Sequence, residues 1–455
     1  MLLRRLQSSL PPFLAGPLAL LTIEDGELSW FEKIGYAVGE GGGNLIFQLV
    51  SIFYLFYLTD VVGISPGAAG TLMLITRLLD GVNDPLTGFL LDKVKLPPRL
   101  GRIKGWLLIS IPLLFLNVIA LFSVPDWSNG GKLIWVYGSY IVFSIVFDLV
   151  ITPYGSLMAV MTREKAVRTQ LSAMRALFSG AAIFVITIAV VKLVDYFPSP
   201  RIGWFWTSVI LGIFACIALS ITYFSVTERI QPINKDLEYE FKDLIAIVLK
   251  NRPLIIIFLF VLFTTAGRTI VNTANIYYFS YNLGNEDLMV QASFFNAAVL
   301  ASFVFTPILS KIYGLQKTAM LGIVITAIST VWRFFIPSDQ IWIIMLSYAL
   351  FAIGSGFPWV LGYTFLTEVI DYTEKVTGYR ADNMINSAYA FIYKISQGLG
   401  SALPAYVLAI TAYNPDAIQQ TPHTLNGILL IVTLVPAAIT ILGAAALYFY
   451  PLKNS

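Results

Sequence analysis

The sequence is poor in charged residues and has almost none of the side chains that form disulfides or bind transition metals. Charged residues make up 12% of the 455 residues, whereas soluble globular proteins carry about 25%. The single cysteine, Cys216, excludes an internal disulfide, and the single histidine, His423, argues against a histidine metal site. A net charge of +3 is too small to indicate a nucleic-acid partner. No nucleophile–base pair or metal cluster is visible, which argues against an enzyme.

Long apolar runs are present instead, because 57% of the residues are hydrophobic. A run of about 20 apolar residues is long enough to cross a bilayer as a helix. The runs predict an all-α polytopic membrane protein with twelve transmembrane helices in two six-helix bundles. The predicted spans are Ile34–Leu58, Ala68–Leu91, Ile103–Val124, Leu133–Val160, Leu171–Val194, Trp204–Val226, Leu254–Tyr281, Val290–Ile312, Ala319–Ile336, Ile341–Ile370, Asn383–Ile410 and Leu425–Tyr450.

The spacing of these runs predicts four parts of the chain. We expect residues 1–30 to form a cytoplasmic N-terminal extension and residues 31–226 to form the first six-helix bundle. Residues 227–253 form a polar linker, whose apolar residues recur on one stripe and predict a short amphipathic helix on the cytoplasmic surface. Residues 254–452 form the second bundle. The halves are weak repeats of each other, and two six-span halves around a midplane site are typical of alternating-access transporters.

Lysine and arginine are unevenly distributed between the connections. The loops after the even-numbered spans and the central linker carry most of them, whereas the opposite loops hold only Lys132 and Arg201. Excess lysine and arginine marks the cytoplasmic side of a membrane protein. The charge pattern therefore predicts that both termini are cytoplasmic.

The second apolar run carries polar side chains that are costly inside a bilayer. Arg77, Asp80, Asn83 and Asp84 are three or four residues apart and fall on one face of a helix. Asp80 is roughly 18 Å from either end of the predicted span, by helix rise. A carboxylate at that depth costs ~2.5–3.5 kcal/mol on insertion scales. The pattern predicts a cation site. The alternative is an internal ion pair, Arg77 with Asp80, that only holds helices together.

A further buried carboxylate, Asp148, lies within the predicted fourth span. Three neighbouring carboxylates could not all remain ionised without a cation. Asp148 therefore supports a cation site that also contains Asp80 and Asp84.

The first span carries a line of polar residues. Glu40, Asn44 and Gln48 recur at every fourth position and face the bundle interior as one line. We expect Asn44 and Gln48 to contact substrate, with helix packing through side-chain hydrogen bonds as the alternative.

Other substrate residues are expected from three later spans. Arg175 lies one turn inside the fifth span and could instead extend to the membrane interface. Trp359 offers a flat apolar face, and Lys394 lies about 16 Å along its span. Arg175 and Lys394 are cationic, and no acidic residue is expected on the substrate side. Together they predict an anionic ligand or one rich in hydrogen-bond acceptors. Near the end of the tenth span, Glu368, Asp371 and Arg380, together with Arg77, predict a gating charge network, with a solvated helix end as the alternative.

Three stretches of the chain resemble the glycoside–pentoside–hexuronide:cation symporters, a branch of the major facilitator superfamily. These stretches are YLTDVVGISPGAAGTLMLITRLLDGVNDPLTGFLLD, TPYGSLMAVMT and TEVIDYTEKVTGYR. The similarity extends over about residues 32–452 and implies twelve helices and import of a glycoside with Na⁺, H⁺ or Li⁺. In the melibiose-permease branch, two aspartates and an asparagine of the second helix hold the cation, and they match Asp80, Asp84 and Asn83. Asp148 stands where that branch has a threonine, which favours H⁺.

The sugar site of that branch matches this sequence less closely. Asn44, Ile151 and Gly155 stand where it has acidic or tryptophan side chains, whereas Arg175 is retained. Trp359 and Lys394 match a tryptophan and a lysine of the family. Several stretches are closer to the glucuronide transporters, including TPYGSL.

The leading hypothesis is a secondary active symporter that couples Na⁺ or H⁺ entry to uptake of a glycoside or sugar acid. We expect no cofactor besides the coupling cation, and a location in a bacterial inner membrane. The alternative substrate is a lysophospholipid, because Ile151 and Gly155 offer no acceptors for sugar hydroxyls. A membrane sensor or scaffold is a third possibility, and the buried carboxylates and Lys394 argue against it. The sequence leaves the exact substrate, the cation and the oligomeric state open.

Overall fold

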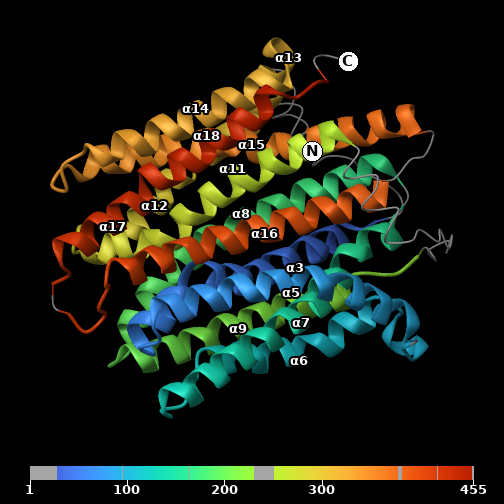
Figure 1. Ribbon diagram of the computed structural model, residues 1–455. Coiled ribbons are helices and arrows are strands. Elements are labelled where there is room, and N and C mark those ends of the chain that lie inside the picture. The colour runs from blue at the N-terminus through green and yellow to red at the C-terminus, as the bar shows by residue number, and fades with distance from the viewer. Residues whose placement is uncertain are drawn as a thin grey trace, which may run out of the picture. The chain divides into compact units, whose positions relative to one another are not determined.

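The computed structural model describes residues 28–229 and 251–452, except for residues 95, 163, 378–381 and 418. Every regular element in this part of the chain is helical (Figure 1). The first 27 residues and the expected amphipathic helix of the linker lie outside the described residues.

The twelve predicted spans are confirmed, and four of them are divided into more than one helical segment. The first span consists of α3 (Trp30–Gln48), η1 (Leu49–Phe53), α4 (Tyr54–Phe56) and η2 (Tyr57–Val61), and the seventh span consists of α11 (Arg252–Tyr277) and η4 (Tyr278–Asn282). The eighth span divides into α12 (Asp287–Asn296) and α13 (Val299–Tyr313), and the twelfth divides into α17 (Pro422–Val432) and α18 (Leu434–Tyr448). The remaining spans are α5 (Pro66–Lys93), α6 (Lys104–Leu121), α7 (Asn129–Met161), α8 (Lys165–Tyr196), α9 (Pro200–Ser225), α14 (Leu315–Phe334), α15 (Ile341–Thr377) and α16 (Asp382–Ile410).

Most of these helices are apolar enough to cross a membrane. Among the described residues, ten helical stretches meet that criterion by length and composition, and α5 and α16 do not. The polar residues of α5 lie on the face for which a cation site is predicted. This all-helical architecture confirms the predicted fold class.

The chain divides into two compact units, each described here by itself. Unit 1 contains the described residues of 1–50 and 82–235, and unit 2 contains those of 51–81 and 236–455. Residues 51–81 join unit 2 because their side chains bond to its later helices. The Thr59 hydroxyl lies 2.7 Å from the Tyr277 hydroxyl, and the Thr71 hydroxyl lies 3.1 Å from that of Tyr406.

Glycine allows close helix packing in unit 1. Helix α3 packs against α8 and α9. A Cβ atom added at Gly42 would lie 2.7 Å from the Cβ of Ala218 on α9, closer than real Cβ atoms approach. The close approach of α3 to α9 therefore requires the absence of a side chain at Gly42.

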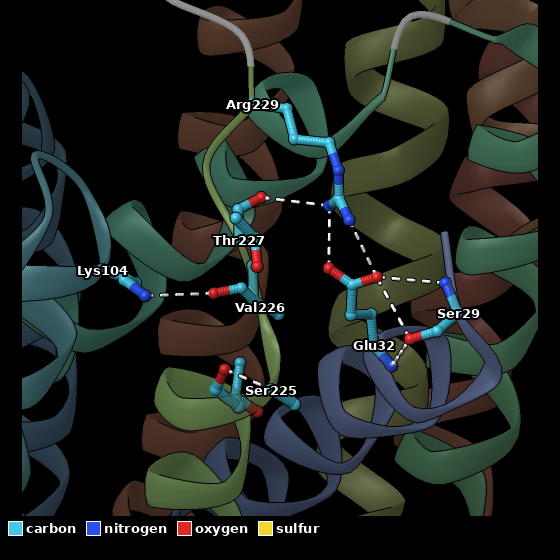
Figure 2. A network of polar contacts seen from close by, with 8 residues as sticks. Ser29, Glu32, Lys104, Ser225, Val226, Thr227 and Arg229 are labelled. Atoms are coloured by element: carbon cyan, nitrogen blue, oxygen red, sulfur yellow. Dashed lines mark hydrogen bonds and ion pairs between the residues drawn. The ribbon is translucent and has the colours of Figure 1, made fainter. Parts of the chain in front are cut away.

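One end of unit 1 is held by charged caps (Figure 2). Ser29 and Glu32 form a capping box at the start of α3. The Arg229 guanidinium, which follows α9, approaches the Glu32 carboxylate to 2.8 Å. Beside it, the carboxylate of Glu228 accepts hydrogen bonds from the first backbone N–H groups of α6, including that of Lys104 at 2.7 Å. These contacts join the start of the linker to the starts of α3 and α6.

A buried arginine stabilises the break in the twelfth span of unit 2. Because Pro436 has no N–H, the carbonyl of Val432 lacks its usual helical donor. The Arg333 guanidinium is fully buried and donates to this carbonyl at 3.3 Å. It also donates to the Ser347 hydroxyl at 2.8 Å and lies 3.6 Å from the centroid of the Tyr348 ring.

Candidate functional site

Helix α5 carries the residues expected to bind the coupling cation. In unit 2, Arg77 pairs with Asp80 at 3.1 Å, and Asp80 is 4% exposed. In unit 1, the side-chain amide of Asn83 donates to the Asp148 carboxylate on α7 at 2.7 Å. Asp148 is 3% exposed. The side chain of Asp84 lies outside the described residues.

The two carboxylates, Asp80 and Asp148, differ in the charge of the partner described above. The guanidinium balances the charge of Asp80, which matches the alternative of an internal ion pair. The partner of Asp148 is a neutral side-chain amide, which donates one hydrogen bond to it. Both carboxylates are buried within the spans, and each is a candidate to receive a cation or proton.

A second polar cluster of unit 1 surrounds Glu40 on α3. The Arg175 side chain on α8 donates to one Glu40 oxygen from Nη2 at 2.6 Å and from Nε at 2.7 Å. The Asn44 amide donates to the other carboxylate oxygen at 3.1 Å and to the Glu40 backbone carbonyl at 3.0 Å. Arg175 also lies 5.1 Å from the centroid of the Tyr154 ring, which stacks on the ring of Tyr36.

This cluster corrects one expectation. The expectation that no acidic side chain lies beside Arg175 is wrong, because the Glu40 carboxylate lies 2.6 Å from its guanidinium. Glu40 was seen as part of a polar line and was not assigned a site role, because its partner lies 135 residues away in the sequence. The charge of Arg175 is therefore balanced within unit 1, and a substrate would meet a neutral pair. Gln48, two turns after Glu40 on the same helix, is half-buried.

In unit 2, the expected substrate residue Trp359 lies on α15 against an arginine. The Arg268 guanidinium from α11 lies 4.1 Å from the centroid of the indole ring. Phe303 of α13 packs edge-on against the same indole at 5.5 Å. Lys394, on α16, is half-buried. Arg268 was not assigned to the site from the sequence, although an arginine in the middle of an apolar span is itself a functional signal.

The residues of the expected gating network are only partly brought together. Glu368 accepts a hydrogen bond from the Tyr450 hydroxyl at 3.2 Å, and Asp371 is exposed. Arg77 pairs with Asp80. Arg380 lies outside the described residues. The network as a whole remains a prediction.

A cluster that the sequence analysis missed surrounds Asp60, near the end of the first span. Its carboxylate accepts hydrogen bonds from the hydroxyls of Tyr281 and Tyr413 and from Thr59 at 2.5 Å. The two tyrosines are 221 and 353 residues away, so no local pattern could have linked them. Burial raises the pKa of the Tyr413 hydroxyl, which therefore remains a hydrogen-bond donor.

Comparison with known proteins identifies the family. Residues 35–454 match the family described as MFS/sugar transport protein. The chain belongs to this family. It is 31% identical to an uncharacterized symporter, YnaJ, of Bacillus subtilis, over 94% of this chain and 93% of that protein. It is 26% identical to the glucuronide carrier protein homolog of Escherichia coli, over 94% of each chain.

Solved structures show the same fold at low sequence identity. A mutant of the nucleoside transporter NupG superimposes with a TM-score of 0.66 over 93% of this chain and 100% of its own, at 12% identity. This likeness confirms the major facilitator fold. The protein is therefore an integral membrane transporter of the symporter type and not an enzyme.

Proposed function

We propose that this transporter couples entry of Na⁺ or H⁺ to uptake of a glycoside or sugar acid by alternating access. The observation that carries the proposal is that two carboxylates, Asp80 and Asp148, are buried within the spans of this transporter. Ionisable side chains are costly inside a membrane and commonly mark substrate or ion pathways. The names of the relatives support the substrate class, since one of them is a glucuronide carrier homolog and another, in Lactiplantibacillus pentosus, is an isoprimeverose transporter.

The cation site of the proposal contains Asp80, Asn83 and Asp84 of α5 together with Asp148 of α7. Asp148 supplies a titratable group, so H⁺ is the preferred cation and Na⁺ the second. We propose that the Glu40–Arg175 pair, with Asn44 and Gln48, contacts the sugar from unit 1. Carboxylate and guanidinium groups bind hydroxyls through charge-assisted hydrogen bonds. We further propose a bacterial inner-membrane location with both termini cytoplasmic, on the evidence of the loop charges.

A counterflow screen in proteoliposomes tests the substrate class. The purified protein is preloaded with unlabelled glycosides, uronides or lysophospholipids, and exchange of labelled compound is followed with and without Na⁺ and across pH values. We expect exchange of glycosides or uronides and acceleration by one cation. Exchange of lysophospholipid alone would overturn the sugar assignment.

The requirement for the cation site is tested with two matched variants. Asp148→Asn removes the charge and keeps the shape of the side chain. Asp126→Asn is the control, because Asp126 is 77% exposed and belongs to a surface pair. Loss of cation acceleration in Asp148→Asn, with normal behaviour of the control, is the expected result. Equal cation acceleration in both variants would contradict the role of Asp148.

A further inference from the structure

Arg268 and Trp359 of unit 2 point to a contact with the substrate, and this contact rests on the proposed function. Arg268 lies 16 residues into α11, or about 24 Å along the helix axis. Its span covers Arg252–Asn282, so the guanidinium originates near the middle of the membrane-spanning stretch. A cation at that depth is costly to insert into a membrane. Such a residue requires either a protein partner or a ligand.

Three other arginines within the spans have partners that account for them. Arg77 pairs with Asp80, and Arg175 pairs with Glu40. Arg333 is fully buried and donates to a hydroxyl and a carbonyl. Each of these guanidinium groups therefore has at least one ion-pair or hydrogen-bond partner in the protein.

Arg268 differs from these three. Within the described part of the chain, no acidic side chain forms an ion pair with Arg268 and no acceptor takes a hydrogen bond from it. Its guanidinium lies over the face of Trp359, 4.1 Å from the ring centroid, and interacts electrostatically with Tyr393 of α16. A guanidinium carries five N–H donors, and an aromatic face satisfies none of them as a hydrogen-bond acceptor would. The side chain is only half-buried, so its donors are accessible to a ligand.

The surroundings of Arg268 suit a sugar that carries a carboxylate. Asn272 lies one turn further along α11 on the same face and is also half-buried. Its amide can donate to and accept from hydroxyl groups. Trp359, which Phe303 packs against, supplies a flat apolar face of the kind on which sugar rings stack. A guanidinium binds a carboxylate through two parallel hydrogen bonds, which fixes the orientation of the ligand.

We propose that Arg268, held over Trp359, binds the carboxylate of a sugar acid and makes this transporter selective for uronides over neutral glycosides. The charge balance of unit 1 supports this assignment, because Glu40 already neutralises Arg175. Arg268 thus takes the anion-binding role that the sequence analysis gave to Arg175.

A matched pair of probes tests the proposal. 4-Nitrophenyl β-D-glucuronide and 4-nitrophenyl β-D-glucopyranoside differ at C6, where the first has a carboxylate and the second a hydroxymethyl group. Binding of both to the purified full-length protein is measured by calorimetry for wild type, Arg268→Gln, Arg268→Lys and Arg201→Gln. Arg201 is the control, because its side chain is 53% exposed and lies in the first turn of α9.

We expect the wild type to prefer the glucuronide. Arg268→Gln should weaken glucuronide binding by about 10- to 100-fold, the range for losing a hydrogen bond to a charged group, and should weaken glucoside binding much less, so that the ratio of the two affinities falls. Arg268→Lys keeps the positive charge but lacks the planar guanidinium, so its affinity for the glucuronide should lie between those of the wild type and Arg268→Gln. Arg201→Gln should match the wild type. If Arg268→Gln fails to fold, the ratio of the glucuronide and glucoside affinities in Arg268→Lys tests whether Arg268 binds the carboxylate.

Two results would overturn the proposal. The first is an unchanged ratio of the two affinities in the Arg268 variants, and the second is a wild type that binds the glucoside as tightly as the glucuronide. Either leaves cation-coupled sugar transport standing if the wild type still exchanges sugars. A wild type that exchanges only lysophospholipid would instead remove the proposed function, and the inference with it.

Discussion

The Glu40–Arg175 pair gives a quantitative prediction about the stability of unit 1. The side chains of Glu40 and Arg175 are 15% and 28% exposed, and the shortest distance between their charged groups is 2.6 Å. Removing one partner of a fully buried pair costs about 3–5 kcal/mol, because the other charge is left uncompensated. Exposed pairs are worth roughly 0.2–1 kcal/mol. For this partly exposed pair we expect a cost of about 1–3 kcal/mol for either Glu40→Gln or Arg175→Gln.

A double-mutant cycle measures this coupling. The double variant Glu40→Gln with Arg175→Gln should lose less stability than the two single variants added together, because neither charge remains alone. Cys216, the single cysteine, is partly buried in unit 1, so a thiol-reactive dye reports the unfolding of this unit. A change of 1 kcal/mol shifts the midpoint by roughly 2–4 °C for a unit of this size.

The control cycle uses the surface pair of Lys132 and Asp126 in the same unit. These groups are 3.6 Å apart, and the Asp126 side chain is 77% exposed. We expect little or no coupling there. Strictly additive effects at Glu40 and Arg175, equal to those of the control pair, would refute the reasoning that Arg175 depends on Glu40 for its charge balance.

Two further predictions rest on particular contacts, and a third rests on the charges of the loops. Asp60→Asn should lower the unfolding midpoint by several degrees, because three hydroxyl donors lose a charged acceptor worth about 1.5–3 kcal/mol per hydrogen bond; an unchanged midpoint would contradict this. Arg333→Met should destabilise the protein by about 1–3 kcal/mol, since the buried Val432 carbonyl loses its donor, and a stabilised variant would show that removing the buried charge matters more. In a cysteine-free background, impermeant reagents added outside cells should label Gly130→Cys and not Arg99→Cys, both of which are exposed sites; the reverse pattern would overturn the orientation.

Much of the fold could be predicted from the sequence because membrane spans are encoded locally. Each needs only about 20 apolar residues, and the twelve predicted runs correspond to twelve helical spans. The interruptions were not predicted. The break between α17 and α18 depends on Pro436 and on Arg333, whose guanidinium reaches the Val432 carbonyl from 99 residues away.

The candidate site was predicted in part for the same reason. Residues that share one helix face, such as Asp80 and Asn83, could be grouped from their spacing. Partners on different helices could not be found, because sequence spacing gives no contact between spans. Glu40 was therefore not connected with Arg175, and Asp60 was not connected with Tyr413.

Concentrative uptake tests the central claim most directly. Proteoliposomes containing wild type, Asp80→Asn or Asp148→Asn are given a labelled sugar and either an inward cation gradient or none, and exchange is measured in parallel. Gradient-driven accumulation by the wild type, with loss of accumulation and retention of exchange in both variants, is the result the account predicts. Undiminished accumulation in the Asp80→Asn, Asp148→Asn double variant would contradict it, because the transporter would then couple to a cation without these carboxylates.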